Sequence, residues 1–172
     1  MLHAGKGTIG EGGAPMLPLL RALLAIGPVM AAAALGSLVT TPNIPTWYAG
    51  LAKPSFTPPN GAFGPVWGLL YLGIMIAAWR LLSLAPWQRG RGAALAAFFV
   101  QLALNAAWSW AFFGLRSPLV GLLVIVPLLA GILVTIRLAW PLDRLASALL
   151  VPYAAWVAYA TALNFAIWRL NS

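Results

Sequence analysis

The sequence predicts an all-α membrane protein in which five transmembrane helices form a compact bundle. Of the 172 residues, 62% are hydrophobic and only 7% are charged, whereas a soluble domain carries roughly 25% charged residues. Five apolar runs each come close to the roughly 20 residues that a helix needs to cross about 30 Å of hydrocarbon. Short connectors join the last four runs, so these helices are expected to be antiparallel neighbours. No run alternates between apolar and polar residues, and a sheet with open edges is not stable in lipid.

A single membrane domain is expected after a short tail. Residues 1–15, "MLHAGKGTIGEGGAP", are Gly-rich and polar and are predicted to be disordered. Residues 16–172 form the five-helix domain, with helices at about 17–39, 62–84, 93–114, 119–138 and 145–168. Lys6 and Arg21, with the stretch that ends in "AAAALGS", would also fit a cleaved signal peptide, although the apolar run is longer than a typical signal core.

The basic residues predict how the bundle is oriented. The net charge of +8 comes from ten Lys and Arg against two acidic residues, and the basic residues stand singly between apolar runs. This spacing favours orientation in a membrane over binding of nucleic acid. With the N-terminus inside, the inner side holds Lys6, Arg21, Arg80, Arg89, Arg91, Arg137 and Arg144, and the outer side holds Lys53, Arg116 and Arg169. The excess of positive charge therefore predicts that the N-terminus is inside and the C-terminus outside.

Prolines lie in the middle of three predicted helices, at Pro28, Pro127 and Pro152. Each removes a backbone hydrogen bond and tends to kink its helix, and kinked helices can surround a cavity. Proline is also simply more frequent in membrane helices than in soluble ones, so both interpretations stay open.

Polar and aromatic residues follow single faces of three predicted helices. The faces are Gln101, Asn105 and Ser109 with Trp108; Tyr153, Trp156, Ala160, Leu163 and Asn164; and Trp67 with Tyr71. Residues at these spacings share one side of a helix. An amide that faces lipid would have no hydrogen-bond partner, so the amides should point into the bundle. They would form hydrogen bonds between helices or line a pocket, and three aromatic faces on three helices favour a pocket.

The predicted spans lack the side chains on which much membrane chemistry depends. No Asp, Glu, Lys or His lies in the middle of a span, the one histidine is His3 in the tail, and the chain has no cysteine. Ion-coupled transport, acid–base catalysis, a metal site and haem ligation by His or Cys are therefore not expected. A large, flat, apolar ligand that is held by stacking, shape and a few hydrogen bonds fits better.

Three ordered motifs resemble the TspO/translocator protein family, formerly called the peripheral benzodiazepine receptor, in its bacterial form. They are "WYAGLAKPSFTPPNGAFGPVWGLLY" (Trp47–Tyr71), "LNAAWSWAFFGLRSP" (Leu104–Pro118) and "VPYAAWVAYATALNFAIWRLN" (Val151–Asn171). The resemblance runs from the first apolar run to the C-terminus.

The resemblance implies a five-helix bundle, usually a homodimer, that binds porphyrins, sterols and synthetic isoquinoline carboxamides in a pocket closed by the first loop. By position, the ligand-lining residues of the family fall on Tyr48, Pro58, Pro59, Trp67, Asn105, Trp108, Trp156, Ala160 and Leu163. No obligatory cofactor and no nucleic acid partner are expected, and a protoporphyrin-type tetrapyrrole is the expected ligand. Some bacterial members degrade protoporphyrin in light, which the resemblance connects with Trp67 and Trp156.

The stiff, aromatic first loop is interpreted as a lid over this pocket. Proline lowers the entropy that a loop loses when it becomes ordered, and aromatic rings offer faces to a flat ligand. A rigid connector inside an interfacial aromatic belt is the alternative interpretation.

One departure from the family bears on the choice of ligand. Animal members carry a Tyr a few residues before an Arg near the C-terminus, as part of a cholesterol-recognition pattern that is weak evidence even when intact. This chain has Phe165 in "LNFAIWR", and Tyr159 lies too far from Arg169. Porphyrin is therefore preferred to sterol. A membrane sensor or regulator of porphyrin or stress metabolism is the main expectation, with a light-dependent porphyrin-degrading enzyme and a porphyrin or sterol transporter as alternatives.

Overall fold

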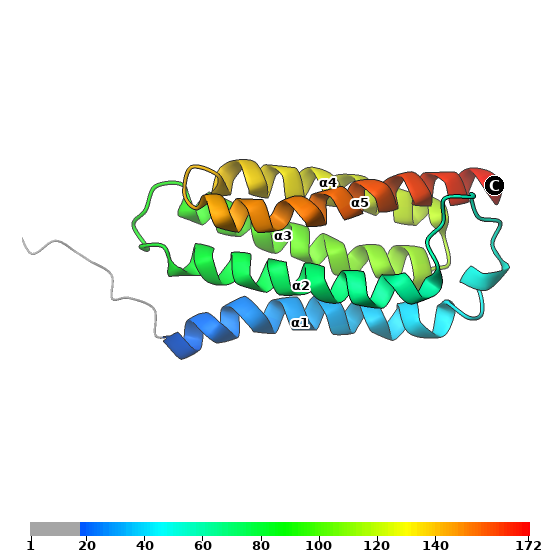
Figure 1. Cartoon of the computed structure of the whole chain (residues 1–172), viewed down its shortest axis with the longest axis horizontal. Coiled ribbons are helices and arrows are strands. Elements are labelled where there is room, and N and C mark those ends of the chain that lie inside the picture. Colours follow the sequence, from blue (N-terminus) through cyan, green and yellow to red (C-terminus); the bar gives the residue numbers. More distant parts are fainter. Residues whose placement is uncertain (1–17) are drawn as a thin grey trace, which may run out of the picture.

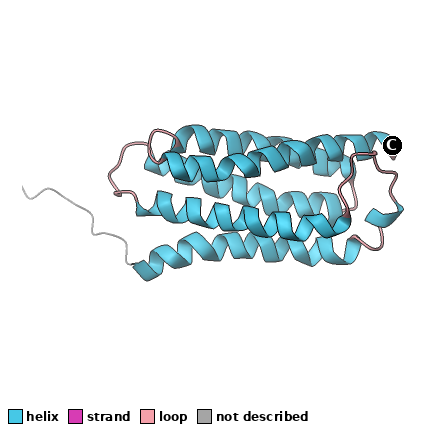
Figure 2. Ribbon diagram, viewed as in Figure 1, coloured by secondary structure: helices cyan, strands magenta, loops and turns pink. Residues whose placement is uncertain are grey.

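The computed structural model of the chain describes residues 18–172 and folds them into five long helices that run up and down in one bundle (Figure 1). The helices are α1 (Pro18–Asn43), α2 (Asn60–Ser83), α3 (Arg91–Ser109), α4 (Pro118–Ala139) and α5 (Arg144–Leu170), with two short turns, η1 (Tyr48–Gly50) and η2 (Trp110–Gly114). No strand occurs among the described residues, as Figure 2 shows. The predicted all-α fold class is confirmed, and the predicted tail over residues 1–15 lies outside the described residues.

The helices pack in a ring, and α2 also contacts α3 across it. Around the bundle the order is α1, α2, α5, α4 and α3, and α3 returns to α1. All five helices are long and apolar enough to cross a membrane, by length and composition. The first loop, residues 44–59, lies at the end of the bundle where α5 ends (Figure 1).

The observed helix bounds differ from the predicted ones by a few residues, and two differences have a physical cause. The first helix continues past 39 to Asn43, whose side-chain amide donates to the carbonyl of Val39 at 2.8 Å. The third helix changes at Trp110 to a wider π-helical turn, in which the Leu115 amide donates to the Trp110 carbonyl at 2.8 Å. This turn buries Phe112 and Phe113 side by side in the bundle. Helices α1, α4 and α5 continue through their mid-span prolines without a break.

The last two helices begin at side-chain caps. The Ser117 hydroxyl accepts from the Val120 amide at 3.3 Å, and Asp143 Oδ1 accepts from the Ala146 amide at 2.9 Å. Asp143 also pairs with Arg80 of α2, whose Nε lies 2.9 Å from Oδ2. Burial works to raise the pKa of Asp143, but the hydrogen bonds and the charge of Arg80, with the backbone amides, hold that pKa below its ordinary value. The carboxylate therefore stays ionised at neutral pH and ties α5 to α2.

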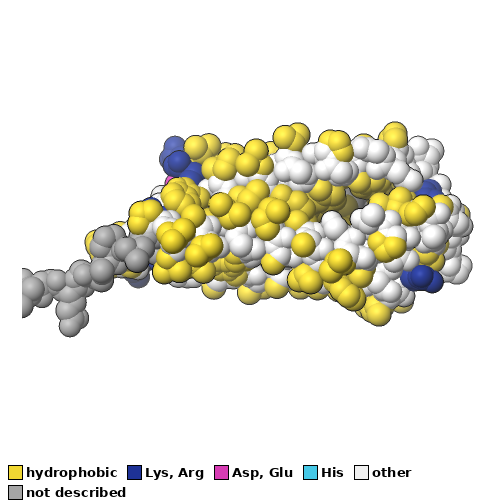
Figure 3. All heavy atoms as spheres, turned by 90° about the horizontal axis from the view of Figure 1, so that it is seen from below, with side chains coloured by type: hydrophobic (Ala, Val, Ile, Leu, Met, Phe, Trp, Pro, Cys, Tyr) yellow, Lys and Arg dark blue, Asp and Glu magenta, His cyan; other side chains and the backbone are white. Residues whose placement is uncertain are grey.

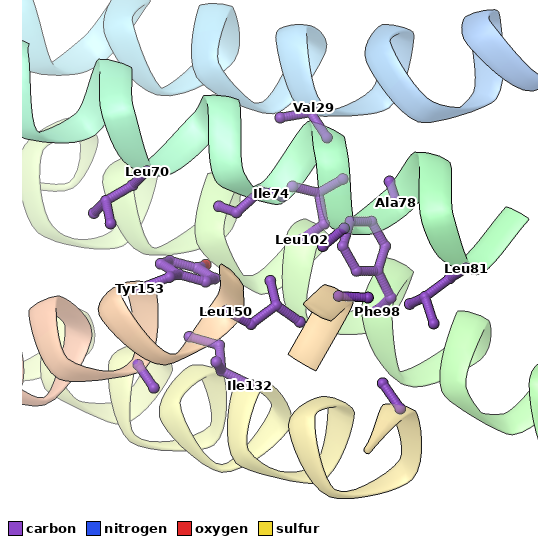
Figure 4. Packing of buried hydrophobic residues seen from close by; sticks show 14 of the residues in the cluster. Val29, Leu70, Ile74, Ala78, Leu81, Phe98, Leu102, Ile132, Leu150 and Tyr153 are labelled. Atoms are coloured by element: carbon purple, nitrogen blue, oxygen red, sulfur yellow. The ribbon is translucent and has the colours of Figure 1, made fainter. Parts of the chain in front are cut away.

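Apolar side chains fill the centre of the bundle and also cover its outer surface. In the centre, Val29, Ile74, Phe98 and Leu150 are completely or almost completely buried (Figure 4). Hydrophobic side chains also spread along the outer face seen in Figure 3, with Lys and Arg gathered near the two ends. A surface this apolar along its length and charged only at its ends is that of a membrane-spanning bundle.

Candidate functional site

A cavity of about 350 Å³ lies inside the bundle at the end covered by the first loop. Its walls come from α1, α2, η2, α5 and the last turn of α3, and Tyr48 of the loop closes it. The wall residues are Ala33, Gly36, Ser37, Thr40, Thr41, Ile44, Tyr48, Phe63, Gly64, Trp67, Gly68, Tyr71, Trp108, Ser109, Phe112, Phe113, Trp156, Ala160, Leu163, Asn164 and Ile167. A volume of this size falls in the range of small-molecule pockets, roughly 300–1,000 Å³.

Six of the nine residues that were predicted to line a ligand site border this cavity. They are Tyr48, Trp67, Trp108, Trp156, Ala160 and Leu163. Pro58 and Pro59 do not border it, because they form the entry to α2, where Pro59 is the residue before the first helical turn. Asn105 lies deeper in the bundle and is almost completely buried.

Aromatic rings surround the cavity and contact one another. The Trp67 and Tyr71 rings stack with their centroids 5.3 Å apart, and Trp156 meets Phe63 edge to face at 6.1 Å. On the opposite wall, the Trp108 and Phe112 rings lie 5.8 Å apart. These contacts fix the ring orientations, so the cavity presents flat apolar faces that are already in place before a ligand arrives.

Two side-chain amides form hydrogen bonds at the wall of the cavity and deeper in the bundle. Tyr71 donates through its hydroxyl to Asn105 Oδ1 at 3.0 Å, and Asn105 Nδ2 donates to the Tyr153 hydroxyl at 3.0 Å. Asn164 accepts from Trp108 Nε1 at 3.2 Å and donates to the Pro118 carbonyl at 2.7 Å. Asn105 and Asn164 therefore form hydrogen bonds between helices, and Asn164 also borders the cavity.

Gln101 neither forms a hydrogen bond between helices nor lines the cavity, the two roles that were expected for the amides. It is completely buried, and its amide has no hydrogen-bond partner among the described residues. A Cβ atom placed on Gly131 of α4 would lie 3.1 Å from the Cβ of Gln101. The Gln101 side chain therefore begins where α3 and α4 are in tight contact. The shared face of Gln101, Asn105 and Ser109 was predicted correctly, but only Ser109 borders the cavity.

The Tyr48 hydroxyl is a polar group at the cavity that has no hydrogen-bond partner among the described residues. The side chain is 3% exposed, and the hydroxyl is buried. Burial, and then the nearby Tyr159, raises the pKa of Tyr48, so its hydroxyl stays protonated and can donate. No Lys, Arg, Asp, Glu or His is among the residues that line the cavity. In the described part of the chain, no group of three or more His, Cys, Asp or Glu could hold a metal ion.

The wall from α1 was missing from the sequence prediction. Ala33, Gly36, Ser37 and Thr40 recur at helical spacing and line the cavity with small side chains. At Gly36 a Cβ atom would lie 3.0 Å from Ser109 Oγ, so α1 approaches α3 closely at this point. The sequence signal for this wall is a stripe of small residues, which is less distinctive than the amides and aromatic rings of the other walls.

The cavity opens sideways between α1 and α2. Ser37 and Thr41 of α1 and Gly64 and Gly68 of α2 border it and are exposed on the outer surface. Figure 3, which views the molecule from the side of α1, shows a hollow towards the end covered by the loop. The cavity therefore has an opening on the side of the bundle in addition to the end that the loop covers.

The first loop is held in place as a lid by α5. Asn171 bonds the backbone of Ala52 twice, accepting from its amide at 3.0 Å and donating to its carbonyl at 2.9 Å. Tyr159 donates to the Phe56 carbonyl. Lys53 places its ammonium 4.7 Å from the centroid of the Tyr48 ring. The sequence predicted a lid from its prolines and rings, but Asn171 was not predicted to hold it.

These features define the class of protein: a membrane-spanning five-helix bundle with a lidded aromatic cavity that opens on its side. The model of the TspO/MBR family matches residues 24–169, and the chain belongs to this family. The chain is 44% identical over 154 residues to the tryptophan-rich protein TspO of Archaeoglobus fulgidus, covering 90% of this chain and 99% of that protein. It is 40% identical over 130 residues to the human translocator protein, covering 73% and 75%. It is 38% identical over 125 residues to the tryptophan-rich sensory protein of Cereibacter sphaeroides, covering 73% and 77%.

Replacing Asn171 with Ala is expected to loosen the lid while leaving the bundle folded. The variant loses both side-chain hydrogen bonds to Ala52. At about 0.5–1.5 kcal/mol for each bond, amide hydrogen exchange in residues 44–59 should accelerate roughly fivefold to a hundredfold, as measured by mass spectrometry. The matched control is Ser172→Ala, the neighbouring residue, which makes no bond to the loop. Unchanged exchange in the Asn171 variant would show that the lid is held in another way.

Proposed function

We propose that this protein binds a protoporphyrin-type tetrapyrrole in its lidded cavity and acts as a sensor or regulator. The single observation that carries the proposal is a cavity inside the bundle walled by indole and phenyl rings, with the protonated Tyr48 hydroxyl as a donor that has no partner among the described residues. A macrocycle is flat, apolar and aromatic, so it can stack on ring faces such as Trp67 and Trp156. The sensory role is supported by the name of the relative from Cereibacter sphaeroides.

The sideways opening also fits this class of ligand. Tetrapyrroles without bound metal partition into membranes, and the opening lies on the outer side of the bundle between two helices that are apolar enough to span a membrane. A sensor that samples the bilayer needs no ion coupling, and the cavity lining carries no charged side chain. The homodimer, and the sterol and isoquinoline carboxamide ligands that the resemblance implies, stay predictions.

A light-dependent degradation of the bound tetrapyrrole is the second candidate function. It is favoured by the position of the Trp67 and Trp156 indoles in the cavity wall, because indole is far easier to oxidise than phenyl. Variants with Phe at both positions should still bind in darkness, because phenyl keeps an apolar face. If these variants lose bound porphyrin in light as fast as the parent protein does, Trp67 and Trp156 do not take part in the degradation and this second function is contradicted.

Filling the cavity should weaken porphyrin binding. Ala160 borders the cavity, so Ala160→Trp places an indole in the space for the ligand. Saturable quenching of tryptophan fluorescence by protoporphyrin IX is expected for the parent protein, and its apparent affinity should fall about tenfold or more in the variant.

The matched control is Ala162→Trp, which adds the same side chain at an exposed position of α5. Equal loss of binding in both variants, or no loss in Ala160→Trp, would place the ligand outside this cavity.

We also propose that the N-terminus is inside and the C-terminus outside. Among the described residues, Arg21, Arg80, Arg89, Arg91, Arg137 and Arg144 gather at one end, and Lys53, Arg116 and Arg169 at the other. The lid then covers the outer end. Reporter fusions should locate the loop at Arg89 inside and the C-terminus at Ser172 outside, and a C-terminus that reports inside would contradict this orientation.

A further inference from the structure

A second recess, of about 250 Å³, lies at the opposite end of the bundle from the lidded cavity. It is formed by the beginning of α1, the end of α2 and the loop that leads to α3. Arg21, Ser83, Trp87 and Arg91 are among the residues that line it. The proposed function uses none of these side chains.

Two guanidinium groups border this recess in fixed positions. Arg21 Nη1 donates to Ser83 Oγ at 3.2 Å, and its guanidinium lies 5.5 Å from the centroid of the Trp79 ring. Arg91 Nη2 donates to the Leu82 carbonyl at 3.2 Å. The Arg91 Nε is buried and has no hydrogen-bond partner among the described residues. Two anchored, planar donors that border one recess match the geometry of phosphate recognition.

The charge of Arg91 is not neutralised by the described part of the chain. Asp143 is the one acidic side chain between residues 18 and 172, and Arg80 pairs with it. Arg91 is also the first residue of α3, and no side chain caps that end of the helix. The positive end of the helix dipole therefore adds to the positive charge of the recess.

The surroundings of the recess are those of a membrane interface. Trp87 is 70% exposed, and Leu24 of α1, three residues after Arg21 and on the same side of that helix, is 37% exposed, with Leu20 at 47%. Tryptophan side chains are typical of the headgroup level, and exposed leucines offer a surface to acyl chains. A phosphate bound at the arginines would thus have apolar surface beside it for the rest of a lipid.

We propose that this recess binds the phosphate of an anionic phospholipid, whose acyl chains lie along the exposed leucines of α1. No carboxylate of the described residues lines the recess to meet a choline group, so the site should prefer phosphatidylglycerol to phosphatidylcholine. Basic recesses between transmembrane helices are a known setting for anionic headgroups. The site is separate from the tetrapyrrole cavity and does not depend on the proposed function.

Native mass spectrometry of the full chain, with equal amounts of phosphatidylglycerol and phosphatidylcholine in detergent, tests this proposal. The parent protein should retain phosphatidylglycerol preferentially. Arg91→Gln should lower that retention about tenfold to a hundredfold, the range for losing a hydrogen bond to a charged group. Arg91→Lys should fall between the two, because it keeps the charge but not the planar donors.

The matched control is Arg89→Gln. Arg89 is an exposed arginine in the loop that leads to α3, and it does not line the recess. Retention by this variant should equal that of the parent protein, and size-exclusion chromatography should give one elution volume for all folded variants. Equal losses in Arg89→Gln and Arg91→Gln would overturn the site in favour of general charge attraction. Equal retention of phosphatidylglycerol and phosphatidylcholine by the parent protein would also overturn the proposal. Displacement of bound phosphatidylglycerol by millimolar inorganic phosphate would overturn it too, because it would identify a site for free phosphate.

Discussion

The absence of water in the hydrocarbon core is the constraint on which this structure depends. A polar group in a span is stabilised by a partner inside the protein, because a polar group left unpaired in lipid costs several kcal/mol; among the buried amides of the spans, Gln101 is the exception. Asn105 and Asn164 meet this requirement through hydrogen bonds to side chains and backbone of neighbouring helices. With the amides bonded in this way, the rings of Trp67, Trp108 and Trp156 are left to form the cavity walls. The same networks that hold the helices together therefore set the shape of the cavity.

The lid extends this arrangement to the outer end of the bundle. Loop backbone cannot be buried without partners, and Tyr159 of α5 and Asn171, which directly follows α5, supply partners for Phe56 and Ala52. The loop is thereby held with Tyr48 over the cavity, where the hydroxyl can meet a ligand. Because α5 also supplies Trp156 and Ala160 to the wall, one helix links the lid to the ligand-facing surface.

The sequence was sufficient to predict the five helices, because length and hydrophobicity determine which segments cross a bilayer. It also predicted the aromatic faces, since helical spacing places Trp67 beside Tyr71 and Trp156 beside Ala160. It could not separate Asn105 from Ser109, which share one face of α3 but differ in depth. Depth depends on how far α1 and α4 stand from α3, and the small residues Gly36 and Gly131 set those distances through tertiary contacts. The change to a π-helical turn at Trp110 was likewise not predicted, because residues 93–114 form one continuous apolar run.

The central claim is that a flat tetrapyrrole occupies the space between the indoles beneath the lid. A structure of the protein with bound protoporphyrin IX in a lipid environment tests it most directly. The account predicts density for the macrocycle between Trp67 and Trp156, with Tyr48 above it and the bonds between Asn171 and Ala52 intact. Density on the outer lipid-facing surface, or a macrocycle that leaves the cavity empty, would contradict it.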